Sequence, residues 1–122
     1  MFLNCLSVGV GGFAGSVIRY LISRVPLGTT TYPVNTFITN LIGAVLIGYI
    51  IARSDRSALS PEQILLLKTG LCGGLTTFST FSAETLGLLE QGSCLTACAY
   101  IVLSLVLCVG GVAVGISIGS RI

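Results

Sequence analysis

The sequence contains no histidine and no tryptophan, and only 8% of its 122 residues are charged. The absence of histidine removes the most frequent general base and a common zinc ligand. No other nucleophile and base stand out as a pair, so we predict that the chain is not an enzyme. Its six basic and four acidic residues are scattered, which argues against a nucleic-acid partner.

The five cysteines form no CxxC pair. They lie in or beside apolar segments, at Cys5, Cys72, Cys94, Cys98 and Cys108. Cys94 and Cys98 are one helical turn apart, where two thiolates could share a soft metal, but no histidine is present to complete such a site. We therefore expect no disulfide and no zinc, and we interpret the cysteines as small apolar residues.

Apolar residues dominate the chain, at 53% of the composition, with a mean hydropathy of +1.01. A transmembrane helix needs about 20 mostly apolar residues. Four such stretches fit, so we predict an all-α integral membrane protein. It has a single membrane domain over residues 1–122 and four transmembrane helices at 2–22, 34–52, 61–90 and 94–118. The first stretch lacks a basic leader and a small-residue cleavage site, so we expect a retained helix rather than a signal peptide.

Polar residues interrupt the first half of the chain at two places. Pro26 and Pro33 flank a Gly-Thr-Thr-Thr turn at 28–31, so the first helix must end before it. Asn40 lies about a turn and a half inside the second helix, where its amide must face protein or water rather than lipid. It could either make an interhelical hydrogen bond or line an ion path.

The third segment is too long for one straight span. Ser60, Pro61 and Glu62 are typical of an N-cap, a first helical residue and an acidic first turn. A helix of 30 residues from there would be about 45 Å long, against about 30 Å of hydrocarbon. Gly70, Gly73 and Gly74 precede a hydroxyl-rich run, so we predict a helix broken at this Gly/Thr motif into two halves. Broken helices at membrane depth commonly form ion sites.

The run from 76 to 85 carries six hydroxyl side chains, namely Thr76, Thr77, Ser79, Thr80, Ser82 and Thr85. On a helix restarting near Thr77, Phe78 and Phe81 share one face and Ser79 and Ser82 share another. Hydroxyl protons and the positive edges of aromatic rings can both contact a dehydrated anion. Unwound carbonyls at 73–77 could hold a hard cation. Alternatively, the rings only pack and the hydroxyls bond back to carbonyls four residues earlier.

Three motifs resemble those of the Fluc (CrcB-type) fluoride channels. The stretch Gly-Gly-Leu-Thr-Thr-Phe-Ser-Thr-Phe-Ser at 73–82 is similar to the family signature. Gly-Gly-Phe-Ala-Gly-Ser-Val-Ile-Arg-Tyr at 11–20 and Thr-Phe-Ile-Thr-Asn-Leu-Ile-Gly at 36–43 resemble its first and second helices. Small departures are Ser16, Asn35, Thr39 and Ala44, and none alters the two phenylalanines or the sodium motif.

The resemblance implies an antiparallel dual-topology homodimer in the cell inner (plasma) membrane, with two pores that export fluoride passively and one structural sodium ion at the dimer centre. The implied pore residues are Asn40, Phe78, Ser79, Thr80, Phe81, Ser82, Tyr100 and Ser104. The implied sodium ligands are the backbone carbonyls of Gly73 and Thr76. Arg19 and Glu84 match vestibule residues. Glu84 could pair with a base, take up a proton or simply be solvated.

The distribution of charge fits either orientation in the membrane. Arg53, Arg56 and Arg121, with Lys68 nearby, are predicted on one side, and Arg19 and Arg24 on the other. An alternative function is a small multidrug-type dual-topology exporter, which would need a buried carboxylate in the first helix. The first segment contains none. A second alternative is a non-conducting assembly subunit, which the glycine packing faces would also suit.

Overall fold

The computed structural model describes residues 1–28 and 31–122, and this part of the chain is helical without strands. Four helical segments are long and apolar enough to cross a membrane, as predicted. Three of them are the continuous helices α1 (Phe2–Ser23), α2 (Val34–Asp55) and α6 (Cys94–Arg121). The third span consists of α3 (Pro61–Ile64), the π-helix η1 (Leu65–Cys72), α4 (Gly73–Leu75) and α5 (Phe78–Glu90). The chain is therefore a multi-pass membrane protein.

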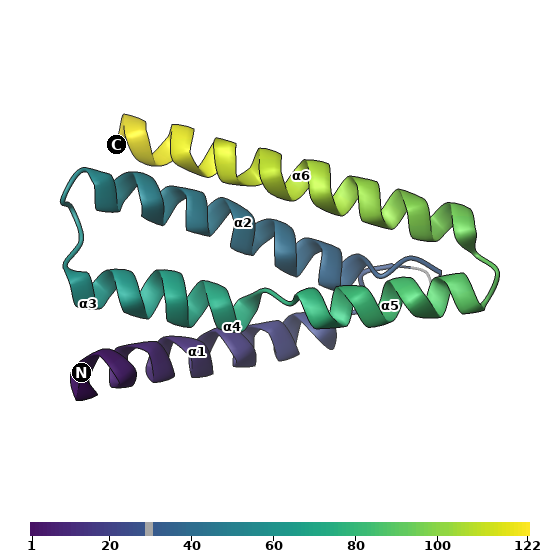
Figure 1. The fold of residues 1–122 in the computed structure, drawn as a ribbon, viewed down its shortest axis with the longest axis horizontal. Coiled ribbons are helices and arrows are strands. Elements are labelled where there is room, and N and C mark those ends of the chain that lie inside the picture. Colours follow the sequence, from purple (N-terminus) through teal and green to yellow (C-terminus); the bar gives the residue numbers. More distant parts are fainter. Residues whose placement is uncertain (29–30) are drawn as a thin grey trace.

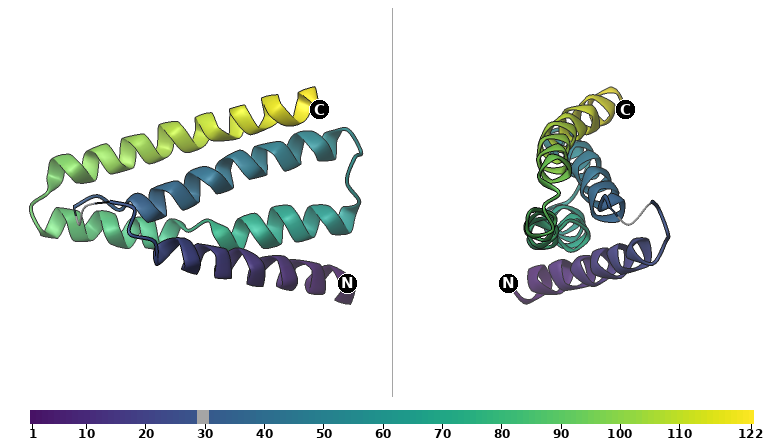
Figure 2. Two further views of the ribbon diagram at one scale, coloured as in Figure 1. Left: turned by 180° about the vertical axis from the view of Figure 1, so that it is seen from behind. Right: turned by 90° about the vertical axis from the view of Figure 1, so that its right-hand side faces the viewer.

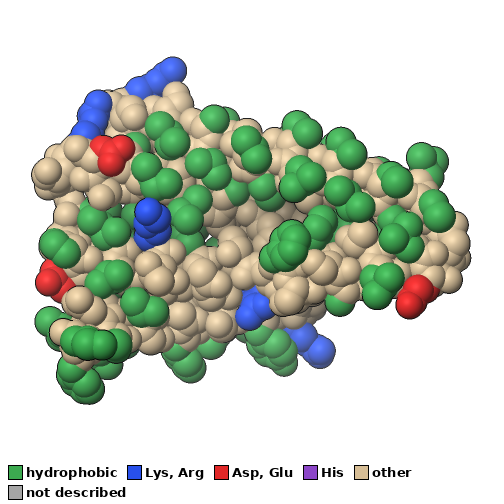
Figure 3. Space-filling model, viewed as in Figure 1, with side chains coloured by type: hydrophobic (Ala, Val, Ile, Leu, Met, Phe, Trp, Pro, Cys, Tyr) green, Lys and Arg blue, Asp and Glu red, His purple; other side chains and the backbone are tan. Residues whose placement is uncertain are grey.

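The spans run side by side as an up-and-down bundle (Figure 1). Both termini and the connection between α2 and α3 lie at one end, and the turn from α5 to α6 lies at the other. Figure 2 shows α1 crossing over the third span on one side, while α2 and α6 pack against each other on the other side. Hydrophobic side chains run along the length of the molecule, with few charged groups among them (Figure 3).

Glycines set the close approach between α1 and the third span. A methyl group at Gly11 would collide with the carbonyl oxygen of Leu66, and one at Gly74 would collide with the carbonyl oxygen of Gly12. Small residues at such crossings allow backbone-to-backbone packing in lipid. The glycines of the first helix therefore form a packing face at these positions.

The third span begins as the sequence predicts. Ser60 is the N-cap of α3 and its hydroxyl accepts a hydrogen bond from the backbone N–H of Gln63. The Gln63 side chain accepts in return from the Ser60 N–H, which completes a capping box. Pro61 occupies the first turn, where its missing N–H costs nothing.

The interruption lies at Thr76 and Thr77, both of which have extended backbones. The predicted break within the Gly/Thr motif is therefore confirmed at its threonines. The glycines stay helical, so the expectation of unwound carbonyls over the whole of 73–77 is wrong for 73–75. Gly73, for example, has φ −64° and ψ −37°. The physical reason is that Gly70, in the π-helix, and Gly74, in α4, both pack against the backbone of α1, which holds this stretch in a helical conformation. The eight-residue π-helix that precedes the break was not predicted.

Asn35 fastens the end of α1 to the start of α2. Its Nδ2 donates hydrogen bonds to the carbonyl oxygens of Ile22 and Val25, each at 2.7 Å. Both carbonyls lie where α1 ends, and each also accepts a backbone hydrogen bond from the following turn, so the Asn35 amide reinforces that turn. Within the predicted turn at 28–31, Thr29 and Thr30 lie outside the described residues.

Candidate functional site

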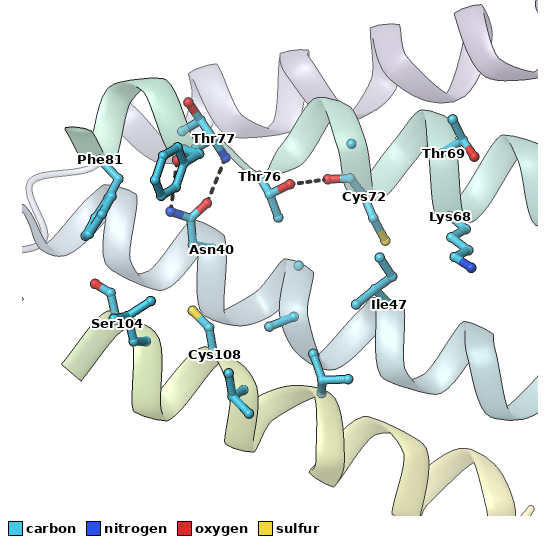
Figure 4. A pocket seen from close by; sticks show the side chains of 17 residues that line it. Asn40, Ile47, Lys68, Thr69, Cys72, Thr76, Thr77, Phe81, Ser104 and Cys108 are labelled. Atoms are coloured by element: carbon cyan, nitrogen blue, oxygen red, sulfur yellow. Dashed lines mark hydrogen bonds between the residues drawn. The ribbon is translucent and has the colours of Figure 1, made fainter. Parts of the chain in front are cut away.

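The break in the third span is braced by one side chain from α2. Nδ2 of Asn40 donates to the carbonyl oxygen of Thr77 at 3.1 Å, and the N–H of Thr77 donates to Oδ1 of Asn40 at 2.8 Å (Figure 4). In a continuous helix that N–H would pair with the carbonyl of Gly73. Thr77 is only 8% exposed, so water could not replace these hydrogen bonds. The side chain of Asn40 thus replaces the helical partners that Thr77 has lost. Of the two roles considered for Asn40 from the sequence, the interhelical hydrogen bond is present.

A groove of about 640 Å³ opens between α2, the third span and α6. Six of the predicted site residues line it, namely Asn40, Gly73, Thr76, Phe78, Phe81 and Ser104. Figure 4 shows Phe81 and Ser104 at one end and Lys68 and Thr69 at the other, with Cys72 and Ile47 between them. The structure therefore gathers residues from three spans along one elongated hollow.

Aromatic rings and one free hydroxyl meet at the first end of the groove. The ring centroids of Phe78 and Phe81 are 5.6 Å apart with an interplanar angle of 36°, and Phe81 lies 5.0 Å from the ring of Tyr100. The hydroxyl of Ser104 is buried, lies on the Phe81 side of α6 and has no hydrogen-bond partner among the described residues. Burying an unpaired hydroxyl costs about 1–3 kcal/mol, so this group is ready for a ligand.

Glu84 is held by two hydroxyl groups rather than by a base. Its Oε1 accepts from the Thr36 hydroxyl at 2.7 Å, and its Oε2 accepts from the Tyr100 hydroxyl at 2.8 Å. Tyr100 is fully buried and Glu84 is half-buried. Glu84 is therefore half-buried and hydrogen-bonded to two hydroxyls, and no ion pair of it is present among the described residues.

Arg19 lies in a different hollow. It lines a pocket of about 310 Å³ between α1, α2 and α5, together with Thr36, Thr39 and Thr80. Thr80 accepts a hydrogen bond from the Thr77 hydroxyl at 3.0 Å, which leaves the Thr80 proton available to the pocket. Arg19 and Thr80 thus line this second hollow and six other predicted site residues line the groove. The remaining four, Ser79, Ser82, Glu84 and Tyr100, line neither, so the structure does not bring all of them together.

Several hydroxyls of the third span bond back to the preceding turn. Thr76 donates to the carbonyl of Cys72 at 2.8 Å, Ser82 to that of Phe78 at 2.9 Å and Thr85 to that of Phe81 at 2.7 Å. Such protons are committed to the helix. Ser79 instead contacts the Thr77 hydroxyl at 3.3 Å, and both Ser79 and Ser82 are exposed. The back-bonding alternative is thus realised for three of the six hydroxyls.

The carbonyl oxygens of Gly73 and Thr76 could bind a hard cation, because the backbone N–H groups that usually bond to them in a helix bond elsewhere. The usual helical donor to Gly73 is diverted to Asn40, and the N–H of Thr80, the usual donor to Thr76, bonds to the Thr77 hydroxyl at 3.2 Å. Both residues line the groove, and Gly73 is exposed on it. Oxygen ligands of this kind fit Na⁺.

The sequence did not single out Thr36 or Thr77 as functional residues. Thr36 orients Glu84, and Thr77 caps α5 through the hydrogen bond from the Thr80 N–H. Tyr32 was also missed, although its ring lies 5.4 Å from that of Tyr100 and extends the aromatic series. The only signal in the sequence was the polarity of Thr36, one helical turn before Asn40 in an apolar segment.

Comparison with known proteins gives a consistent picture. The family model described as CrcB-like protein, Camphor Resistance (CrcB), matches residues 6–116. A protein of Chlorobaculum tepidum named fluoride-specific ion channel FluC is 52% identical over 104 residues, which cover 84% of this chain and 82% of that protein. Proteins of the same name from Clostridium novyi and Methanococcus aeolicus are 43% and 48% identical, over 92% and 70% of this chain and 90% and 70% of their own lengths. These relatives are named as channels and not as enzymes, which agrees with the prediction from the sequence.

Proposed function

The chain belongs to the CrcB-like protein family, and we propose that it is a fluoride-selective channel through which fluoride leaves the cell passively across the inner (plasma) membrane. Its relatives carry the name of such a channel. The observation that carries the proposal is the unpartnered Ser104 hydroxyl on the Phe81 side of the groove. A donor without a partner beside aromatic rings is a place where a small anion can be bound.

The mechanism follows from the cost of dehydration. Fluoride entering a low-dielectric path loses its water, and each contact must replace part of that hydration without trapping the ion. Ser104 offers a proton, and Phe78 and Phe81 offer positive ring edges. The second proton of Asn40 Nδ2 is also available, because a side-chain amide carries two. Loose binding at several such points lets the ion move on.

We infer that two antiparallel copies form the channel. In this chain Phe78 is 76% exposed, and the neighbouring hydroxyls of Ser79 and Ser82 are exposed on the same helix. The Ser82 hydroxyl donates to the Phe78 carbonyl and the Ser79 hydroxyl contacts that of Thr77, so both have partners within the chain. A second copy over the groove would cover the exposed Phe78 ring and shield these polar side chains from lipid. The small charge bias between the two ends is compatible with insertion in both orientations.

A structural sodium ion at the dimer centre is part of the same proposal. The carbonyls of Gly73 and Thr76 would hold it, and it would contribute a fixed positive charge between the two paths. Elemental analysis of protein dialysed into sodium-free buffer should find one sodium per two chains. A sodium content at background level in a stable, conducting dimer would remove this ion from the account.

The proposed pore is tested by two matched substitutions. Phe81→Ile removes a ring from the groove, whereas Phe13→Ile removes a ring that is 74% exposed on α1 and lines neither hollow. Fluoride efflux from liposomes, followed with a fluoride electrode, should be lost in the first variant and kept in the second. Size-exclusion chromatography checks that both remain dimeric. Undiminished efflux through the Phe81→Ile variant would refute the pore assignment.

A further inference from the structure

Lys68 is a charged side chain at membrane depth whose role nothing above explains. It lies in the π-helix η1, seven residues after Pro61 and within the third span. At 1.5 Å per residue it is about 10 Å from the start of that span. Because the span is about 15 Å longer than the hydrocarbon, this position is near the membrane interface, where a lysine can keep its charge in contact with water. Ionisable residues within a span are nevertheless rare and commonly serve an ion or substrate path.

Lys68 is exposed and is one of the residues that line the groove. Lys68 and the neighbouring Thr69 both line the groove, at the end opposite Phe81 and Ser104 (Figure 4). Among the groove-lining residues Lys68 is the one Lys or Arg, and no Asp or Glu joins it there. The remaining lining is mostly apolar, but the Lys68 side chain is itself exposed, so water screens part of its charge.

No carboxylate neutralises this charge within the part of the chain that the structure describes, where no ion pair occurs. Glu84, the acidic residue of α5 that precedes its last turn, is bound by Thr36 and Tyr100 instead. Lys68 therefore leaves a net positive charge on the groove.

In the antiparallel dimer of the proposed function, the charge of Lys68 would lie near the fluoride path of the other copy. Lys68 lies eight residues before Thr76 and Glu84 lies eight residues after it. Suppose that the two-fold axis lies in the membrane plane near Gly73 and Thr76. The rotation then places the depth of Lys68 in one copy at the depth of Glu84 in the other copy. Lys68 of one copy then lies at the depth of the stretch from Phe81 to Glu84 of the partner subunit, beside the proposed fluoride path.

We propose that Lys68 is an electrostatic determinant of fluoride entry, which acts on the path of the partner copy by lowering the cost of bringing an anion to its phenylalanines. The inference rests on the proposed function. In general, a unit charge on the order of 10 Å from an ion, across a medium with an effective dielectric constant of about 50, changes the occupancy of the ion by about threefold. The effect is on the rate, since every anion gains from the same charge, and the preference for fluoride over chloride stays as it is.

The test compares variants of the full-length dimer in planar bilayers. Lys68→Gln and Lys68→Met remove the charge, Lys68→Arg keeps it, and Arg56→Gln removes one charge from the exposed connection between α2 and α3. At low ionic strength, single-channel fluoride current should fall about threefold in the two neutral variants and stay unchanged in Lys68→Arg and Arg56→Gln. Added potassium sulfate should shrink the difference by screening.

Two results would overturn the proposal. One is an equal current in Lys68→Gln, Lys68→Met and the wild type at low ionic strength. The other is a loss of the same size in Lys68→Arg that salt does not reduce, which would indicate packing. The wild-type recording distinguishes failure of the proposed function from failure of the role of Lys68. A wild type without fluoride current would refute the proposed function. A conducting wild type with unaffected variants would refute only the role of Lys68.

Discussion

At the scale of single residues, Asn40 determines where the third span is interrupted. Its two hydrogen bonds to Thr77 satisfy an N–H and a carbonyl that the break would otherwise leave buried and unpaired. The amide also lines the groove, so the group that shapes the break faces the proposed path as well. The interhelical bond and a role in ion binding are compatible because the amide has a second proton.

Replacing Asn40 by leucine should destabilise the protein and stop fluoride efflux together. Two backbone groups of Thr77 would lose their partners, at about 1–3 kcal/mol each. Thermal unfolding in detergent should show a midpoint lowered by about 5 °C or more. Asn4→Leu, at an exposed position of α1, is the control and should leave both stability and efflux unchanged. An Asn40→Leu variant with wild-type stability would contradict the bracing role.

Residue spacing was enough to predict that Phe78 and Phe81 lie together and that Asn40 must face protein. It was not enough for the contacts of Glu84. Its partners Thr36 and Tyr100 lie 48 and 16 residues away in the chain, so only the packing of α2, α5 and α6 brings them together. The pore, vestibule and sodium roles of the individual residues stay predictions.

At the scale of helices, glycine contacts set the distance between α2 and α6, and thereby the walls of the groove. Gly115 of α6 packs against the backbone of α2, where an added methyl group would collide with the carbonyl of Val45 and lie 2.8 Å from the N atom of Tyr49. Gly110 on the same helix has open space around it. Gly115 therefore contacts α2 and Gly110 does not, although both lie in the same helix, so Gly110 is a matched control for Gly115.

Gly115→Ala should lower stability while Gly110→Ala should not. Alanine is the better helix former by about 1 kcal/mol at both sites, so any difference reports the contact with α2. Overpacking of this kind costs about 1–3 kcal/mol. Thermal unfolding of both variants in the same detergent measures it. Equal stability of the two would show that α2 and α6 are not held at the distance described.

The start of the third span could be predicted from Ser60 and Pro61 because caps are local signals. The excess length of the span also predicted an interruption. The exact place could not be predicted, because it depends on where Asn40 meets the chain and on the packing of Gly70 and Gly74 against α1. The π-helix has no signature in the sequence, since its extra residue per turn is accommodated by neighbouring helices.

At the scale of the whole molecule, one chain presents an open groove and an exposed phenylalanine, which two opposed copies would enclose. Native Cys94 gives a direct test of opposed insertion, because it is exposed where α6 begins. In sealed vesicles, a variant that keeps Cys94 alone should react with a membrane-impermeant maleimide in about half of its chains. Permeabilised vesicles provide the control, in which all chains should react. Labelling of all chains or of none in sealed vesicles would contradict dual topology.

The number of spans and the membrane location followed from composition, because hydropathy over about 20 residues is a strong signal. The assembly could not be derived in that way, since a contact between two copies leaves no pattern along a single chain. Only the resemblance of the motif at 73–82 suggested it.

The most direct measurement of the central claim is anion efflux from liposomes that contain the purified wild-type protein. Fluoride and chloride are loaded at equal concentration, and their release is followed with ion-selective electrodes after a potassium ionophore removes the opposing voltage. The account predicts rapid release of fluoride with chloride retained. Release of both anions at similar rates, or of neither, would contradict it.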